Sequence, residues 1–190
     1  MKTKEENVAI RPAKEEDIKG ILKVQEELLI KNKTQNEVGK NGFLVYSLKE
    51  EELKNMISLK QNFLLVAESV REIVGYALAY DLNVWRKNKP QWDEEITADT
   101  SIKNHLSKNK IIYFRHIARK SQNPGVGIKL EEKIYEMAKH KGYQFVIGEI
   151  LERPILNEKS KTVHEQRGYK RIGQVDYPDG KVWGLYEKKL

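Results

Sequence analysis

The feature that most constrains this fold is a short glycine-containing segment, residues 122–127, which separates a strand-like run from an amphipathic helix. The preceding run, residues 111–118, is rich in β-branched and aromatic residues, which is typical of a buried strand. From Val126 onward, apolar residues recur at helical spacing. Gly125 and Gly127 let a ligand approach the backbone closely, and the first N–H groups of the helix point outward there. Such a helix end binds phosphate, so the sequence predicts a strand, an anion-binding loop and a helix.

The composition is that of an ordinary globular protein. The chain has 190 residues, of which 39% are hydrophobic and 33% are charged, so we expect one domain spanning residues 1–190. No run is long enough to cross a bilayer, and residues 1–6 lack the apolar stretch of a signal peptide, which predicts a cytoplasmic protein without a membrane partner. The absence of cysteine excludes a disulfide scaffold and a thiolate nucleophile. The four histidines show no metal-ligand spacing, so we expect no metal.

The formal net charge of +7 allows two interpretations. Lysine and arginine are spread along the chain and form no basic block of five or six residues, which favours a solvated surface over a nucleic-acid or ribosome-binding one. We therefore do not expect a nucleic acid partner. An anionic small cofactor would be attracted by the same charge.

Hydrophobic periodicity and turn residues predict an α+β chain in which helices cover a mixed sheet. The predicted strands are 8–11, 63–68, 73–80, 111–118, 144–150, 169–177 and 181–187. The predicted helices begin after Pro12, at a capping box over residues 47–50, at Val126 and after an Asn157 cap. The second and third strands are close enough in sequence to form an antiparallel hairpin. Residues 81–110 indicate an irregular polar connection with one short helix near 99–107.

The order of these elements resembles the GNAT superfamily of N-acetyltransferases over nearly the whole chain. The cofactor loop of that family, Q/R-x-x-G-x-G/A, is matched by Gln122, Gly125 and Gly127. Further matches are residues 8–12, 74–76, 157–160 and 168–169. The resemblance implies the GNAT fold, an α+β fold with a central mixed, mostly antiparallel sheet of about seven strands flanked by helices. In that fold the parallel fourth and fifth strands splay apart.

The resemblance also implies that acetyl-CoA binds as co-substrate in the gap between these strands, with its pyrophosphate on the amides of the glycine loop. A backbone N–H between Ile117 and Arg119 is expected to bind the acyl oxygen. Asn157 and Ser160 would cap a helix, contact the pantetheine arm, or do both. The expected cofactor-binding residues are Ile117, Ala118, Arg119, Gln122, Asn123, Gly125, Val126, Gly127, Ile128, Asn157 and Ser160.

One departure from the family pattern lies in the loop. The residue before Gly125 is commonly arginine or lysine in the family, but here it is Pro124, which has neither an N–H nor a charge. Arg119, Lys120 or Lys129 could supply the missing phosphate contact. A proline there also suits the first turn of a helix, so a purely structural role explains it equally well.

A second departure concerns the general acid. In the family pattern N-x-x-S/A-x-x-L-Y-x-x-x-G-F, one position often holds a tyrosine that acts as general acid, and here that position is His164. A neutral imidazole N–H could donate a hydrogen bond to the leaving sulfur, and the imidazolium is a stronger acid than tyrosine. The alternative is that His164 only occupies the exposed face of a short helix.

Two residues are candidates for the general base that removes the amine proton, namely His116 and Glu149. Strand alternation decides which face each side chain meets, and the sequence leaves that phase open. For His116, packing in the core is the competing interpretation. Aromatic and acidic residues of the preceding stretch would either form an acceptor pocket or serve as core plugs and solvated charges. These residues are Tyr80, Trp85, Trp92, Asp93, Glu94, Glu95 and Asp99.

The sequence therefore predicts an N-acetyltransferase that moves acetyl from acetyl-CoA to the primary amine of a small molecule or peptide, by direct attack in a ternary complex. The alternative is a non-catalytic acyl-CoA-binding or sensor module of the same fold, which Pro124 and the missing tyrosine would favour. The resemblance allows a homodimer, because family members often dimerise, but the residues leave the oligomeric state open. The residues do not identify the acceptor.

Overall fold

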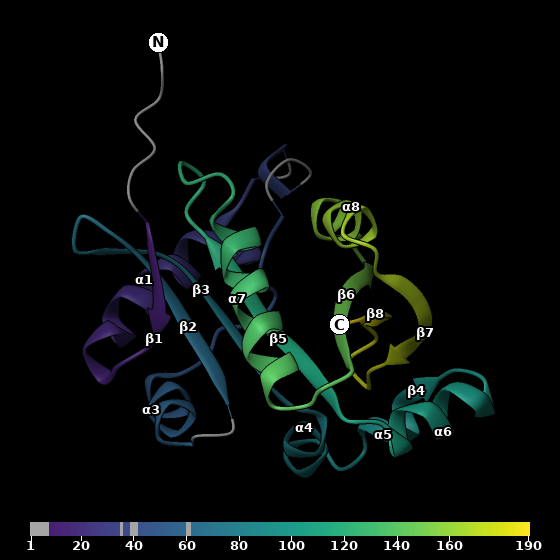
Figure 1. Ribbon diagram of the computed structural model, residues 1–190. Coiled ribbons are helices and arrows are strands. Elements are labelled where there is room, and N and C mark those ends of the chain that lie inside the picture. Colours follow the sequence, from purple (N-terminus) through teal and green to yellow (C-terminus); the bar gives the residue numbers. More distant parts are fainter. Residues whose placement is uncertain (1–7, 35, 39–41, 60–61) are drawn as a thin grey trace.

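The computed structural model describes residues 8–34, 36–38, 42–59 and 62–190 (Figure 1). The strands are β1 (Ala9–Pro12), β2 (Phe63–Ser69), β3 (Glu72–Asp81), β4 (Ile96–Thr97), β5 (Ile111–Arg119), β6 (Phe145–Arg153), β7 (Lys170–Asp176) and β8 (Val182–Lys189). The helices are α1 (Ile18–Leu28), α3 (Glu50–Ser58), α4 (Leu82–Asn88), α5 (Trp92–Glu95), α6 (Thr100–Lys108), α7 (Val126–His140) and α8 (Glu158–Gln166).

The described strands form one sheet in the order β1-β2-β3-β5-β6-β8-β7-β4. Only β5 and β6 run parallel, and the other pairs are antiparallel. This confirms the predicted mixed, mostly antiparallel sheet and its single parallel pair. The strand number is eight instead of about seven, because Ile96–Thr97 adds a short edge strand that pairs with β7. The predicted fourth and fifth strands are therefore β5 and β6.

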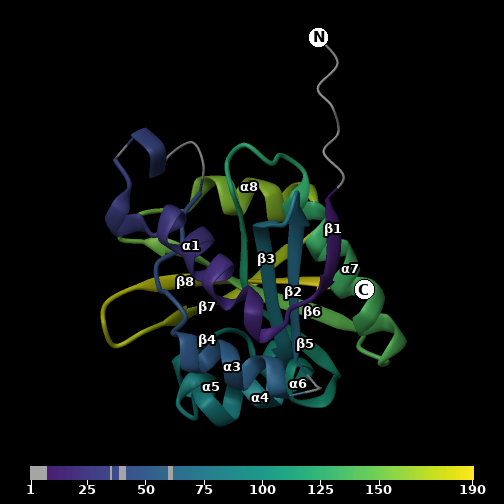
Figure 2. The same ribbon diagram turned by 90° about the vertical axis from the view of Figure 1, so that its left-hand side faces the viewer.

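Helices cover both faces of the sheet. Figure 2 shows α1 and α7 on opposite sides of β2 and β3. One hydrophobic core lies under α1, α3, α4 and α5 and includes Tyr76, Tyr113 and Trp92. The other lies under α7 and includes Phe114 and Tyr186. Because successive strand residues face opposite sides, each central strand contributes side chains to both cores.

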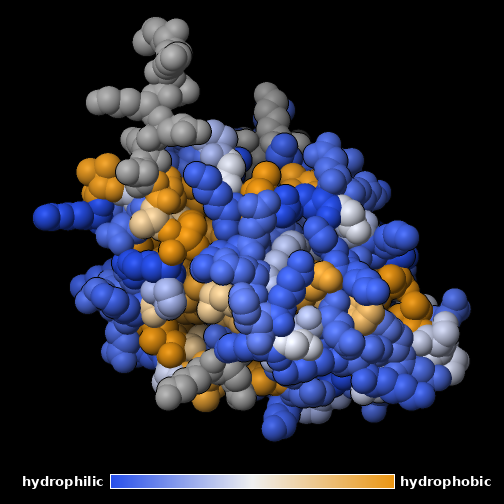
Figure 3. Space-filling view, in the orientation of Figure 1, coloured by the Kyte–Doolittle hydropathy of each residue, from blue (hydrophilic) through white to orange (hydrophobic). Residues whose placement is uncertain are grey.

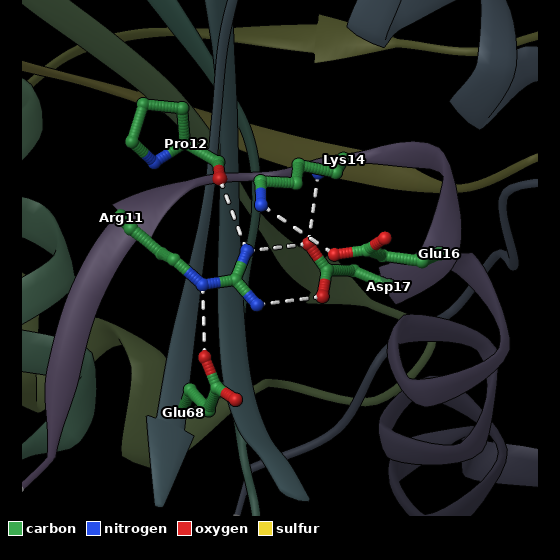
Figure 4. Close-up of polar contacts among 6 residues, drawn as sticks. All are labelled: Arg11, Pro12, Lys14, Glu16, Asp17 and Glu68. Atoms are coloured by element: carbon green, nitrogen blue, oxygen red, sulfur yellow. Dashed lines mark hydrogen bonds and ion pairs between the residues drawn. The ribbon is translucent and has the colours of Figure 1, made fainter. Parts of the chain in front are cut away.

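An arginine fork ties the first strand to the turn that follows it (Figure 4). Nη1 and Nη2 of Arg11 donate to the carboxylate of Asp17 at 2.6 and 2.8 Å, and Nε donates to Glu68 on β2 at 2.8 Å. Asp17 is only 5% exposed. The hydrogen bonds from Arg11 hold the pKa of the Asp17 carboxyl below its ordinary value. Pro12 ends β1 as predicted, and the strand tolerates it because β1 is an edge strand.

The hairpin between β2 and β3 is confirmed, and its turn is unusual in composition. Val70 and Arg71 both adopt positive φ, 49° and 64°. This is the pattern of a type I′ turn, which is normally built from glycine or asparagine. Pairing along the two strands therefore outweighs the local cost of the turn.

Two local predictions are wrong. Helix α3 begins at Glu50, where the Lys49 amide donates to Glu52 at 2.7 Å, so the capping box lies two residues later than predicted. Residues 81–110 form three helices and β4 instead of one irregular connection. Burial of Trp85 and Trp92 in the core supplies the tertiary contacts that stabilise these short helices. The predicted helix near 99–107 is confirmed as α6.

The surface seen in Figure 3 is mostly polar, with smaller apolar groups between the charged residues. Among the described residues, no helix combines the length and the apolar character needed to cross a bilayer.

Candidate active site

The parallel strands part in the middle of the sheet. β5 and β6 are paired from Ile111 with Phe145 to Phe114 with Gly148. Beyond that point β5 continues along β3, and β6 continues along β8. The register between β3 and β5 also shifts there, because Ala79 pairs with Phe114 while Leu78 pairs with His116. Arg115 is thus the extra residue of a β-bulge, which bends β5 away from β6.

A cavity of about 570 Å³ lies at this gap. Its wall includes Phe114 and Ile150, which belong to the core under α7, and Trp85 and Tyr113, which belong to the opposite core. The cavity is therefore lined from both faces of the sheet. Two reactants can enter such a cavity from opposite sides and meet between the strands.

The glycine loop leaves the start of α7 open. Gly125 has φ of 81°, no side chain caps the helix, and the first helical bond runs from the Lys129 amide to the Gly125 carbonyl at 3.1 Å. A Cβ on Gly125 would meet no atom within 4 Å, and one on Gly127 would meet only Cδ1 of Ile117, at 4.0 Å. The two glycines thus have open space beside them at the start of α7, where the first helical amides lack intrahelical partners, an arrangement that suits a diphosphate.

The loop does not itself line the cavity, but Ile117 connects the two, because it lines the cavity and also lies beside Gly127. The amide of Lys120 donates to Val74 of β3 at 2.8 Å. Backbone groups alternate in direction along an antiparallel strand, so the amide of Ala118 also faces β3. The amides of Ile117 and Arg119 face the gap. Of residues 117–119, one of which is predicted to bind the acyl oxygen, Ile117 and Arg119 therefore have amides that do not bond to β3.

The three predicted substitutes for a basic residue at Pro124 differ in their surroundings. Lys120 is buried and forms an ion pair with Glu72, so it is committed to the protein interior. Nη1 of Arg119 donates to the carbonyls of Lys120 and Ser121 at 2.9 and 3.0 Å, which braces the base of the loop. Lys129 is exposed in the first turn of α7.

The remaining polar loop residues lie around this end of α7. Gln122 is exposed and accepts a hydrogen bond from the Ser121 hydroxyl at 3.3 Å. Asn123 is buried, and its Oδ1 has no hydrogen-bond partner within the described residues.

His164 lies on α8 and lines the cavity. Its Nδ1 is 2.7 Å from the carbonyl of Ser160. A carbonyl only accepts, so Nδ1 carries the proton and Nε2 of the neutral ring carries none. Nε2 points toward β6, 4.0 Å from where a Cβ on Gly148 would lie.

Burial lowers the pKa of the His164 imidazole, so the ring is neutral at neutral pH. The Ser160 carbonyl thus holds the proton of the neutral ring, so the hydrogen bond from His164 to the leaving sulfur stays a prediction that requires a proton on Nε2. Only the imidazolium could donate from Nε2.

Asn157 and Ser160 also line the cavity. The side-chain oxygen of Asn157 accepts from the Ser160 amide at 3.4 Å, which confirms the predicted helix cap. Its amide group donates to the Phe43 carbonyl at 2.9 Å and joins α8 to the N-terminal half of the chain.

Glu149 lies on β6 just beyond the last pair with β5. One carboxylate oxygen accepts from Nε1 of Trp92 at 2.7 Å, and the other accepts from the Tyr177 hydroxyl at 2.9 Å. Burial raises the pKa of the Glu149 carboxyl, and the two hydrogen bonds partly offset this. The carboxylate is thus held in the cavity wall with a basicity above that of an ordinary glutamate.

His116 lines the same cavity, and its Nδ1 is 3.0 Å from the Tyr76 hydroxyl. Burial, followed by the charge of Arg115, holds the pKa of the imidazole well below its ordinary value. It is therefore a weaker base than an exposed histidine. Burial thus strengthens Glu149 as a base and weakens His116, so Glu149 is the better candidate for the general base.

Some of the residues predicted to form an acceptor pocket do line the cavity, and the others are core residues or exposed charges. Trp85 stacks on Tyr113 with 4.6 Å between ring centroids and lines the cavity, as does Glu95. Trp92 is buried in the core but reaches Glu149 through its indole N–H. Tyr80 is a core residue, and Asp93, Glu94 and Asp99 are exposed.

Among the cavity residues that were not sequence candidates are Arg115, Tyr177 and Trp183. Arg115 could have been found, because it is the one charged residue in the otherwise apolar run 111–118. Tyr177 and Trp183 reach the cavity through the pairing of β8 with β6, which no local pattern reveals. Among the described residues, no three histidine, aspartate or glutamate side chains are grouped as a metal site.

No protein-family model and no curated protein matches the sequence. Ard1 from Thermoplasma volcanium superimposes with a TM-score of 0.66 at 10% identity, covering 96% of this chain and 97% of that one. An N-acetyltransferase from Staphylococcus aureus Mu50 gives 0.62 at 19%, covering 96% and 98%. The chain has the GNAT fold.

A third GNAT structure, the PaiA N-acetyltransferase from Thermoplasma acidophilum, was solved in complex with coenzyme A. It superimposes with a TM-score of 0.61 at 15% identity, covering 97% of this chain and 99% of that one. The resemblance noted in the sequence is thus confirmed at the level of the fold. The splayed β5 and β6, and the open start of α7, are the parts of this GNAT fold that carry the candidate chemistry.

Proposed function

We propose that this protein is an N-acetyltransferase that moves acetyl from acetyl-CoA to the primary amine of a small molecule or peptide. The observation that carries the proposal is the cavity at the gap in the sheet, which is lined both by Glu149, bonded to Trp92 of one core, and by His164, whose ring contacts Tyr169 of the other core. Such a cavity lets the amine attack the thioester directly, with both reactants bound at once.

The residues of the loop fit the co-substrate. The outward amides of Val126, Gly127 and Ile128 would hold the diphosphate, and exposed Lys129 would add a charge. Acetyl-CoA supplies the acyl group in an activated thioester. The gap-facing amides of Ile117 and Arg119 would donate to the acyl oxygen as negative charge builds on it.

The attacking amine must lose a proton. In the proposed step, the amine nitrogen forms a bond to the acyl carbon, the carbon–sulfur bond breaks, and the amine proton goes to the Glu149 carboxylate. Trp92 and Tyr177 hold that carboxylate in place through both of its oxygens. Its raised pKa makes it a better proton acceptor than a solvated glutamate.

His164 has a secondary role in this scheme. A thiol of pKa about 8.5 is a good leaving group, so the sulfur can depart as thiolate without a donor. Nε2 of His164 points toward β6 at the cavity and is an acceptor in the neutral ring. A proton that Nε2 takes up from solvent can then pass to the departing thiolate.

The second candidate is a non-catalytic acyl-CoA-binding module. The observation that favours it is the neutral His164, which lacks a proton on the atom that faces the gap. Calorimetric titration with acetyl-CoA, followed by measurement of free thiol across a panel of primary amines, separates the two candidates. Binding with amine-dependent thiol release supports the transferase. Binding without thiol release supports the sensor, and no binding rejects both.

A further inference from the structure

The guanidinium of Arg115 is a cavity charge that the proposed reaction leaves unused. Arg115 is the bulged residue of β5, lines the cavity, and lies 5.0 Å over the ring of Trp85. Within the described part of the chain, no carboxylate forms an ion pair with it. Three other partly buried guanidinium groups have such partners, since Arg11 binds Asp17, Arg86 binds Asp93 and Arg167 binds Glu131. Arg119 instead donates to backbone carbonyls.

Nearby groups favour the charge of Arg115 and raise its pKa, although none of the described carboxylates forms an ion pair with it. Glu149 is the one carboxylate among the groups that act on it, and the others are the hydroxyls of Tyr80, Tyr113 and Tyr177. Glu149 instead receives its hydrogen bonds from Trp92 and Tyr177. A guanidinium withdrawn from water without an anion is costly, so a group from outside the protein is the fitting partner.

The other charged groups of the cavity wall are Lys89, Glu95 and Asp179. Asp179 forms an ion pair with Lys181 at 2.6 Å. Lys89 is the cation that acts on Glu95, whose two oxygens are buried without hydrogen bonds. Arg115 and Glu149 are left as one positive and one negative group in the same wall, close enough to interact but not bonded to each other.

We propose that the acceptor is a free amino acid, whose carboxylate binds to Arg115 while its amine faces Glu149. An α-amino acid carries its two charged groups on one carbon, which matches two neighbouring wall groups of opposite charge. Arginine binds a carboxylate through two parallel N–H donors, which also fixes the orientation of the amine. This inference rests on the proposed function for the identity of the reacting amine.

The test uses pairs of amines that differ only in the carboxylate, namely phenylalanine with phenethylamine, lysine with cadaverine, and arginine with agmatine. Binding of each to the protein saturated with CoA is measured by calorimetry, which needs no turnover. We expect the carboxylate member of at least one pair to bind about 10- to 100-fold more tightly, the range for hydrogen bonds to a charged group. Equal binding within every pair, tighter binding of the decarboxylated members, or no binding by any of the six overturns the proposal.

Two variants locate the effect. Arg115→Met keeps an unbranched apolar stem but removes the guanidinium, and it should remove most of the discrimination between the two members of a pair. Arg115→Lys keeps the charge but loses the paired donors, so it should retain only part of the discrimination between the two members of a pair. The CoA titration of each variant shows that it is folded, and discrimination that is unchanged in folded Arg115→Met excludes Arg115 as the subsite. If Arg115→Met does not fold, Arg115→Lys decides in the same way.

Turnover separates the two proposals. Thiol release that is equal for both members of each pair keeps the transferase and overturns the carboxylate subsite. Discrimination in binding without thiol release from acetyl-CoA keeps the subsite and overturns acetyl transfer.

Discussion

Replacement of Gly127 gives the sharpest test of the proposed diphosphate site. Gly125 is less suitable, because its φ of 81° means that any side chain there strains the backbone. Gly127 is the second residue of α7, has ordinary helical geometry, and offers room for a Cβ with only Ile117 nearby. Gly127→Glu and Gly127→Gln are nearly isosteric, so they differ essentially in charge.

Both variants should be more stable than the wild type. Leaving glycine inside a helix costs about 0.5–1 kcal/mol, so either side chain recovers part of that cost. A glutamate in the first turn adds about 0.3–1 kcal/mol through the helix dipole. In a chain of this size, 1 kcal/mol raises Tm by about 2–4 °C.

Acetyl-CoA binding should move in the opposite direction to stability in Gly127→Glu. A carboxylate roughly 5 Å from one phosphate charge costs about 0.8–3 kcal/mol at an effective dielectric constant of about 80 down to 20, or roughly 4- to 160-fold in Kd. The neutral Gly127→Gln measures the steric part alone. Calorimetry at low and high salt checks that the loss of affinity is electrostatic, because salt should reduce the difference in Kd for acetyl-CoA between the two variants. If the two variants bind acetyl-CoA equally at low salt, the diphosphate does not lie at this helix end.

Three further predictions concern other parts of the structure. Gly75→Ala places a Cβ 2.8 Å from Val126 and 2.9 Å from the Ala118 carbonyl, so chemical denaturation should show a free energy of unfolding that is lower by about 1–3 kcal/mol. Gly148→Ala, whose Cβ has its nearest contact at 3.7 Å, is the matched control and should be about as stable as the wild type. Glu149→Gln should lower kcat about 10²- to 10⁴-fold, and the wild-type rate should rise with pH through the raised pKa of Glu149, a profile that the variant should lack. Asp17→Asn should lower the free energy of unfolding by about 1.5–3 kcal/mol at pH 7. Because the folded-state pKa of Asp17 is lowered, its stabilisation is present above the unfolded value of about 3.9 and is lost as pH falls through the folded value. A difference in stability between variant and wild type that does not shrink in acid would contradict this.

Much of the architecture was readable from local patterns. The run 111–118, the start of α7 at Val126, the Asn157 cap and the terminal hairpin are confirmed, because each depends on residues that are neighbours in sequence. The stretch 81–110 was misread for the opposite reason. Its helices are short, and they depend on burying Trp85 and Trp92 against distant strands.

The candidate site was predictable in its residue types more than in its geometry. Glu149, His116 and His164 do line one cavity, as do Asn157 and Ser160. Their chemical states were not readable. The proton of His164 is placed by the Ser160 carbonyl, and the basicity of Glu149 depends on burial together with Trp92 and Tyr177.

The sequence by itself determined the order of the elements and the open glycine turn before α7, since both follow from short-range periodicity and from the freedom of Gly125 and Gly127. Only the tertiary structure decided which side chains meet. The bulge at Arg115 resets the phase of β5, so that the adjacent Arg115 and His116 both reach residues of the core under α1, Trp85 and Tyr76, and both line the cavity with Glu149 of another strand. Such a bulge arises from pairing between strands far apart in the chain, and its effect on side-chain direction is invisible to any local pattern.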